Sequence, residues 1–186
     1  RDTLQFLWDQ TVRSANKGLT LNETINVIKL PRQFSDHYTT QQLYGLVEHH
    51  VRQIYTGLFG WFDEDEANLF PVPLPERSQR LVEGFGGKAR VREIIDASLT
   101  KNDFRWAIEL SSWLVRGNFN DLGIADAGEL EDRNRLASAL RGVAYTTSAA
   151  NIRNWCITRA LELDETLNLS RFRKHRFSKR ELSRRT

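Results

Sequence analysis

The stretch "NDFRWAIELSSWLV", residues 102–115, carries the clearest helical pattern in the chain. Trp106 precedes Leu110 by four residues, and Trp113 and Leu114 follow it by three and four. Residues at these spacings share one face of an α-helix, so this stretch predicts a helix with a buried aromatic and aliphatic face. The preceding "TKND", residues 100–103, predicts a turn that separates this helix from the one before it.

The same period extends in both directions along the chain. At the start, an apolar stripe predicts a first helix that stops at Gly18, formed by Leu4, Leu7, Trp8, Thr11, Val12 and Ala15. Thr20 and Glu23 match a capping box, which predicts a short second helix ended by Pro31. Thr39 and Gln42 match a second capping box, which predicts the start of the longest helix, through Leu43, Val47, Val51, Ile54 and Leu58.

Glycines and prolines divide the rest of the chain. The run "FPVPLPE", residues 70–76, predicts an extended connector, and Gly86-Gly87 predicts a helix stop followed by a helix start. Further helices are predicted over 75–84, 88–100, 104–116, 128–143 and 149–163, the last with a buried face of Ile152, Trp155, Cys156, Ala160 and Leu163. No strand alternation occurs, so we predict an all-α fold: a bundle of about eight helices, with antiparallel hairpins and repeat-like packing in the C-terminal half.

Composition is that of a globular protein, with 40% hydrophobic and 27% charged residues among 186. No apolar run approaches the roughly 20 residues that a membrane span needs, and the charged start predicts no signal peptide. The chain has no Met, so we expect it to be part of a longer protein. Its compartment is left open.

The basic character of the chain lies in its tail. The last 16 residues, "RFRKHRFSKRELSRRT", hold eight Lys or Arg against one Glu, a net charge of +7. The whole chain carries +3, so residues 1–170 carry −4. Such a run is typical of a solvated tail or linker, and the lack of a recognisable binding module argues against nucleic-acid binding.

Sites of metal or nucleophilic chemistry are not predicted. The lone cysteine, Cys156, lies in the apolar run "NWCIT" and is predicted to be a buried, inert thiol. Adjacent residues on a helix point about 100° apart, so His49 and His50 cannot jointly chelate one ion. The four histidines show no HxH, HxxxH or HExxH spacing. We therefore expect no metal and no cofactor bound within this chain.

The two adjacent histidines differ in their predicted direction. His50 follows Val47 by three residues and precedes Ile54 by four, so it falls on the apolar stripe, as a core or interface histidine would. His49 points off that stripe, toward a face predicted to hold Gln42, Gly45 and Gln53. That direction leaves room for a ligand or a second domain, so His49 is the candidate site residue.

Four ordered motifs resemble the helical dimerisation domain of the linear alkylsulfatases, enzymes of the metallo-β-lactamase superfamily. The resemblance covers residues 1 to about 164 and is carried by "DQTVRSANKGLTLNETINVIKLP", "YGLVEHHVRQIYTGLFGWFDEDEANL", "RLVEGFGGKARV" and "NDFRWAIELSSWLV". It implies a homodimer in which the helices of two subunits interlock. It also implies a catalytic domain before this chain, on which this domain packs, and a sterol-carrier-like domain after it.

The resemblance also assigns the chemistry. Two zinc ions are expected in the catalytic domain, held by an HxHxDH motif that this chain lacks. His49 matches the histidine of the family's Tyr-Gly-x-x-x-His-Asn pattern, which reaches the sulfate pocket, and His50 stands where the family has Asn. There His49 would contact the substrate or donate a proton. Departures occur at Glu64-Asp65-Glu66, at "RGVAYTT" and at Ile152-Arg153-Asn154.

These inferences give one leading hypothesis and two rivals. Residues 1–165 form the dimerisation domain of an alkylsulfatase-like hydrolase, and 166–186 form a basic tail or link toward a further domain. Five Trp and ten Phe, with "LFGWF" at 58–62, indicate an aromatic surplus typical of an interface, although core packing is the simpler account. The rivals are a helical-repeat module that binds a peptide and a nucleic-acid clamp formed by the tail.

Overall fold

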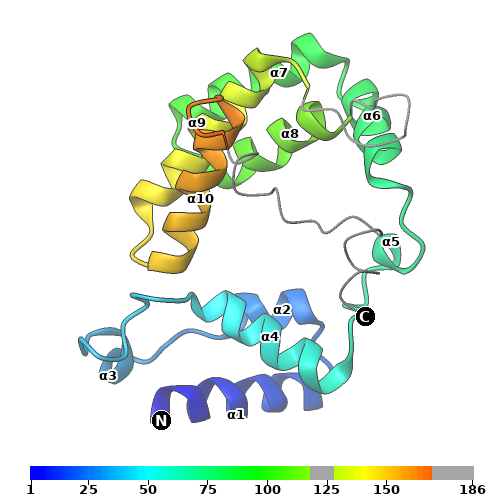
Figure 1. Cartoon of the computed structure of the whole chain (residues 1–186). Helices are drawn as coiled ribbons and strands as arrows, with labels where there is room; N and C mark the ends of the chain where they lie inside the picture. Colours follow the sequence, from blue (N-terminus) through cyan, green and yellow to red (C-terminus); the bar gives the residue numbers. More distant parts are fainter. Residues whose placement is uncertain (118–127, 169–186) are drawn as a thin grey trace, which may run out of the picture.

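The computed structural model describes residues 1–117 and 128–168 and arranges them as two helical units joined by a connector (Figure 1). The N-terminal unit holds α1 (Asp2–Asn16), α2 (Leu21–Val27), α3 (Arg32–Ser35) and α4 (Val47–Phe59). The connector carries α5 (Glu66–Leu69). The C-terminal unit holds α6 (Leu74–Gly84), α7 (Lys88–Thr100), α8 (Phe104–Arg116), α9 (Leu130–Thr146) and α10 (Ala150–Leu163). The all-α prediction is confirmed, since the described ranges contain helices and no strand.

The described residues contain two short helices more than the predicted eight. Ten helices occur in the described residues, and the two that were not predicted, α3 and α5, have four residues each. Pro31 does not end α2, which already stops at Val27; it is the N-cap residue of α3. A helix of one turn has too few residues to show a hydrophobic period, so the sequence pattern does not reveal such a helix.

The predicted start of the fourth helix is wrong. Residues 37–46 are not helical, and α4 begins at Val47 instead of after Thr39. Gln42 does cap this helix, but from outside: its Oε1 accepts the Val47 N–H at 2.7 Å. The longest described helix is consequently α9, with 17 residues, whereas α4 has 13.

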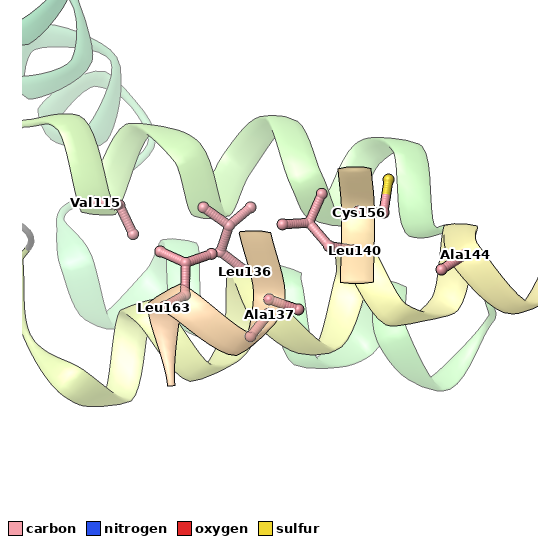
Figure 2. Close-up of a cluster of buried hydrophobic side chains, with 8 residues drawn as sticks. Val115, Leu136, Ala137, Leu140, Ala144, Cys156 and Leu163 are labelled. Atoms are coloured by element: carbon pink, nitrogen blue, oxygen red, sulfur yellow. The ribbon is translucent and has the colours of Figure 1, made fainter. Parts of the chain in front are cut away.

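In the C-terminal unit α7, α8 and α9 each pack on the next helix along the chain, in agreement with the predicted repeat-like hairpins, and α6 packs mainly on α8. Two clusters of buried side chains fill it. One joins α6, α7 and α8 to Ala139 and centres on Leu110, which is fully buried. The other joins α8, α9 and α10 and is drawn in Figure 2, with Leu136, Leu140 and Leu163 pointing at one another. Cys156 lies buried at its edge, as predicted.

The aromatic side chains of this unit divide into those packed against the clusters and those exposed to solvent. Trp106 and Trp113 meet edge to face, with ring centroids 6.1 Å apart, and Phe85 covers Trp113 at 5.2 Å. The prediction that Trp155 is buried with Cys156 is wrong, because the tryptophan is 63% exposed. Helix α10 turns Cys156, Ala160 and Leu163 inward, and Trp155 lies one residue off that face.

The N-terminal unit has a smaller core. Leu7 of α1, Ile28 and Val51 of α4 form its buried cluster, flanked by partly buried neighbours, and Leu21 and Tyr55 are buried beside it. The predicted stripe of α1 is only half correct, because Thr11 is buried with Leu7 whereas Leu4 and Trp8 face outward. This unit therefore presents apolar side chains that it does not cover itself.

Candidate functional site around His49

The candidate residue His49 lies in the first turn of α4. Leu46 is the N-cap residue of this helix and offers no side-chain hydrogen bond, so Gln42 supplies the missing acceptor. The backbone N–H groups of His49 and His50 both point to the Leu46 carbonyl oxygen, at 3.1 and 3.0 Å. The turn that carries His49 is therefore held by local backbone bonds and by one side chain from upstream.

The imidazole of His49 is directed outward, as the sequence predicted, with 48% of the side chain exposed. Its nearest charged neighbour is Glu48, whose Oε1 lies 3.8 Å from His49 Nε2. The sequence predicted that Gln42, Gly45 and Gln53 share a helical face with His49. This prediction is wrong for Gln42 and Gly45, because both precede α4. Whether His49 contacts a substrate remains a prediction.

His50 does not occupy a core position. Its side chain is exposed, and its ring lies across Gly45: a Cβ at that glycine would come within 2.8 Å of His50 Nε2. The glycine thus makes room for His50, not for His49. His50 also borders a hollow of about 270 Å³ between α1 and residues 39–47.

Glu48 forms the main charged contact of the site. Arg105, at the start of α8, forms a bidentate ion pair with Glu48: Nη2 donates to Oε1 at 2.7 Å and Nη1 donates to Oε2 at 3.0 Å. This hydrogen bonding lowers the pKa of the Glu48 carboxyl and raises the pKa of the Arg105 guanidinium. Glu48 is thus held ionised and joined to the other helical unit.

A second set of bonds joins the units beside this ion pair. Ser148 Oγ donates to the Gln42 carbonyl oxygen at 2.8 Å, and the Ala150 N–H donates to the Leu43 carbonyl at 2.8 Å. The Asn151 N–H completes the set by donating to the Tyr44 carbonyl at 3.3 Å. The chain leading into α4 is therefore fastened to the turn between α9 and α10.

Between the two units lies a hollow of about 470 Å³. Glu48 and Arg105 line it together with residues of α2 and the segment after it and with residues at and before the start of α4: Ile25, Asn26, Ile28, Lys29, Leu30, Gln42, Leu46 and Val47. His49 is not among them. The half-exposed imidazole of His49 therefore lies beside Glu48 but does not line this hollow.

Other kinds of chemistry have less support in the described part of the chain. Burial raises the pKa of the Cys156 thiol, which keeps it protonated and weakly nucleophilic. Within residues 1–117 and 128–168, no three His, Cys, Asp or Glu side chains gather closely enough to hold a metal ion. The predicted basic tail at 171–186 lies outside the described residues. None of the helices in the described ranges combines the length and apolarity that crossing a membrane requires.

A sequence profile described as alkyl sulfatase dimerisation matches residues 20–166, which is most of the chain. The chain belongs to the alkyl sulfatase dimerisation family. Its similarity to whole proteins agrees with this assignment. A linear primary-alkylsulfatase of a Pseudomonas species is 37% identical over 90% of the chain, and an (R)-specific secondary-alkylsulfatase of Pseudomonas is 34% identical over 88%.

Solved structures support the same family. The stereoselective inverting sec-alkylsulfatase Pisa1 from Pseudomonas sp. matches with a TM-score of 0.79 and 32% identity, covering 90% of this chain and 25% of that one. The alkyl sulfatase dimerisation domain described here spans 30% of the length of the first relative and 24% of the second. It corresponds to one module of those larger proteins.

Sequence inspection missed Glu48 and Arg105 as parts of the site. They are 57 residues apart, and each sits in a stretch rich in other charges. Helical phase could have shown that Glu48 and His49 share the first turn, but no local signal connects that turn to α8.

Proposed function

We propose that this domain is the dimerisation module of a zinc-dependent alkylsulfatase-like hydrolase. The match to the alkyl sulfatase dimerisation family over residues 20–166 carries the proposal. The parent would hydrolyse alkyl sulfate esters, with water activated between two zinc ions in a catalytic domain of the metallo-β-lactamase superfamily. Residues 1–165 would form the module and 166–186 the start of a link to a further domain.

The surface supports association with a second copy. Seven large apolar side chains are exposed between the last turn of α4 and the first turn of α6: Leu58, Phe59, Trp61, Leu69, Phe70, Val72 and Leu74. We call residues 58–74 the apolar arm. Trp61 is 71% exposed and Phe70 is 88% exposed, and exposed aromatic clusters of this kind are typical of interfaces. In Figure 1 the arm connects the two helical units, from the end of α4 through α5 to α6.

Light scattering after size exclusion tests the association. The chain is expected to elute at twice its 21.6 kDa mass. Replacing Trp61 and Phe70 by Ala should weaken the dimer by about 2 kcal/mol or more, because buried aromatic anchors dominate interface energies. Tyr145→Ala, which truncates an equally exposed aromatic on α9, is the matched control and should leave the dimer intact. A wild-type chain that stays monomeric at high concentration would contradict the proposal.

The pocket role of His49 needs the full-length protein. With dodecyl sulfate as substrate, His49→Ala should lower kcat by about 100-fold, the size typical of a lost proton donor, at unchanged zinc content. His50→Ala, one residue away and directed toward Gly45, is the control and should retain activity. Equal losses in both variants would assign the effect to the helix start instead of to the His49 imidazole.

A further inference from the structure

The ion pair between Glu48 and Arg105 has a geometry that concerns His49 directly. Each carboxylate oxygen of Glu48 accepts a hydrogen bond from a different terminal nitrogen of the Arg105 guanidinium. The same Oε1 that Arg105 holds at 2.7 Å lies 3.8 Å from His49 Nε2. One carboxylate oxygen therefore stands between two candidate partners, and the arginine is the nearer.

The three groups come from two helical units. Glu48 and His49 are neighbours in the first turn of α4, and Arg105 lies in the first turn of α8. Hydrogen bonds between residues 42–44 and 148–151 join the segment before α4 to the start of α10, so the two units are also fastened to each other beside this pair. The Arg105 side chain is 78% exposed, so its pairing serves little to hide charge from water. Exposed ion pairs stabilise proteins only slightly, so this pair contributes little to folding stability.

We propose that Arg105 is a positioning residue for His49: by holding both oxygens of Glu48 it keeps the carboxylate from closing its 3.8 Å ion-pair distance to His49 Nε2 into a hydrogen bond. This inference rests on the proposed pocket role of His49. A Glu48 carboxylate released by Arg105 would be free to rotate to hydrogen-bond distance of the ring and hold it in a close local pair. The imidazole would then be turned toward its own helix, away from the sulfate ester that it must reach.

The chemistry of the pair explains why an arginine stands there. A planar guanidinium presents two parallel N–H donors and matches a carboxylate at both oxygens. A lysine ammonium is a point charge and leaves one oxygen available. Arg105→Lys should therefore preserve the charge but hold Glu48 incompletely.

Kinetics of the full-length protein on dodecyl sulfate test this role. Arg105→Ala should lower kcat by about tenfold with a smaller change in KM, since misdirecting a reacting group affects mainly the chemical step. Arg105→Lys should fall between that variant and the wild type. The double variant Glu48→Gln/Arg105→Ala should recover most of the loss, because the amide carries no charge with which to hold an imidazolium.

The matched control is Arg116→Ala, which removes an arginine at the opposite end of the same helix and should not alter turnover. If the double variant is as slow as Arg105→Ala, the pair merely anchors two helices and the proposal is overturned. If His49→Ala is impaired while Arg105→Ala matches Arg116→Ala, the positioning role fails and the pocket role of His49 stands. If His49→Ala itself is fully active, the proposed pocket role fails first.

Discussion

The two helical units differ in how far each is complete by itself. In the C-terminal unit, five helices enclose two buried clusters, and ion pairs cross between its helices. The N-terminal unit buries three apolar side chains in its core cluster and leaves Leu4, Trp8 and Val27 exposed. Both units leave large apolar side chains exposed, Tyr145 and Trp155 among those of the C-terminal unit, so the difference lies in the size of the buried core. It indicates that the C-terminal unit is the main scaffold of the domain.

Ion pairs within the C-terminal unit are also more buried than the ion pair that joins the two units. Arg92 of α7 binds Asp132 of α9 at both oxygens, at 2.7 and 2.8 Å, and Arg135 binds Asp96 at 2.9 and 3.0 Å in the reverse sense. Asp132 is completely buried. These reciprocal pairs fix the register of α7 against α9. The pair between Glu48 and Arg105, which joins the two units, is much more exposed.

The largest loss is expected at the centre of the scaffold. Leu110→Ala removes a fully buried side chain from the cluster between α6, α7 and α8. The free energy of unfolding should fall by about 4 kcal/mol, because a tightly packed site cannot collapse to fill the cavity. Urea denaturation followed by circular dichroism measures this. Leu130→Ala, a half-exposed leucine of α9, is the control and should change it by less than about 1 kcal/mol.

The buried ion pair should come next. Asp132→Asn removes the buried carboxylate that accepts two hydrogen bonds from Arg92 and leaves this arginine only its exposed partners Glu129 and Glu131. The change should cost about 3 kcal/mol, because charge-assisted hydrogen bonds are lost at a fully buried side chain. Glu93→Gln breaks the exposed pair with Arg90 and should cost no more than about 0.5 kcal/mol. Urea denaturation of both variants provides the comparison, and equal losses would show that burial of Asp132 contributes nothing.

A substitution in the thinner unit should have a local effect. Val51→Ala removes two methyl groups from the small core of α1, α2 and α4, at a cost of about 2 kcal/mol. Hydrogen exchange should show faster exchange of the amides in these three helices, with those of α8 unchanged. Uniform acceleration across both units would mean that they unfold together, and the proposed division would be wrong.

The smallest effect concerns acid stability. Hydrogen bonding from Arg141 lowers the pKa of Asp164 to about 2, below the value of about 3.9 in an unfolded chain. The stabilisation is therefore present above about pH 4 and is lost as the pH falls toward 2. In urea titrations at pH 5 and pH 3, Asp164→Asn should be less sensitive to this change than the wild type, by no more than about 1 kcal/mol. Identical pH dependence would show that Asp164 contributes nothing to acid stability.

Sequence reasoning succeeded where a helix has many turns and a continuous apolar face. The bounds predicted for α7 and α8 agree with the structure, because glycine or turn residues border both and their buried faces recur regularly. The prediction of a helix start at Thr39 failed. Thr39 and Gln42 match a capping box in sequence, but their side chains make different hydrogen bonds in the structure. Thr39 contacts the His37 ring, and Gln42 caps the helix five residues further on.

The site was predictable only in its local part. The outward direction of His49 follows from helical phase. The exposure of His50 depends on Gly45, which lies before the helix and lets the ring lie over it. Gly142 is a second residue whose role the sequence does not reveal. A Cβ at this position would overlap the Phe104 ring of α8, so the glycine lets α9 and α8 approach closely. Contacts between distant segments have no periodic signature.

The apolar arm contains Pro71 and Pro73 just before α6, with Pro75 in the first turn of that helix. Each ring fixes one backbone torsion, both in the free chain and in any assembly. A segment that is stiff beforehand loses less conformational entropy when it becomes covered than a glycine- and serine-rich loop of equal length. The arm can therefore present its aromatic side chains to a second surface at a low ordering cost, and substituting these prolines should weaken association by raising that cost.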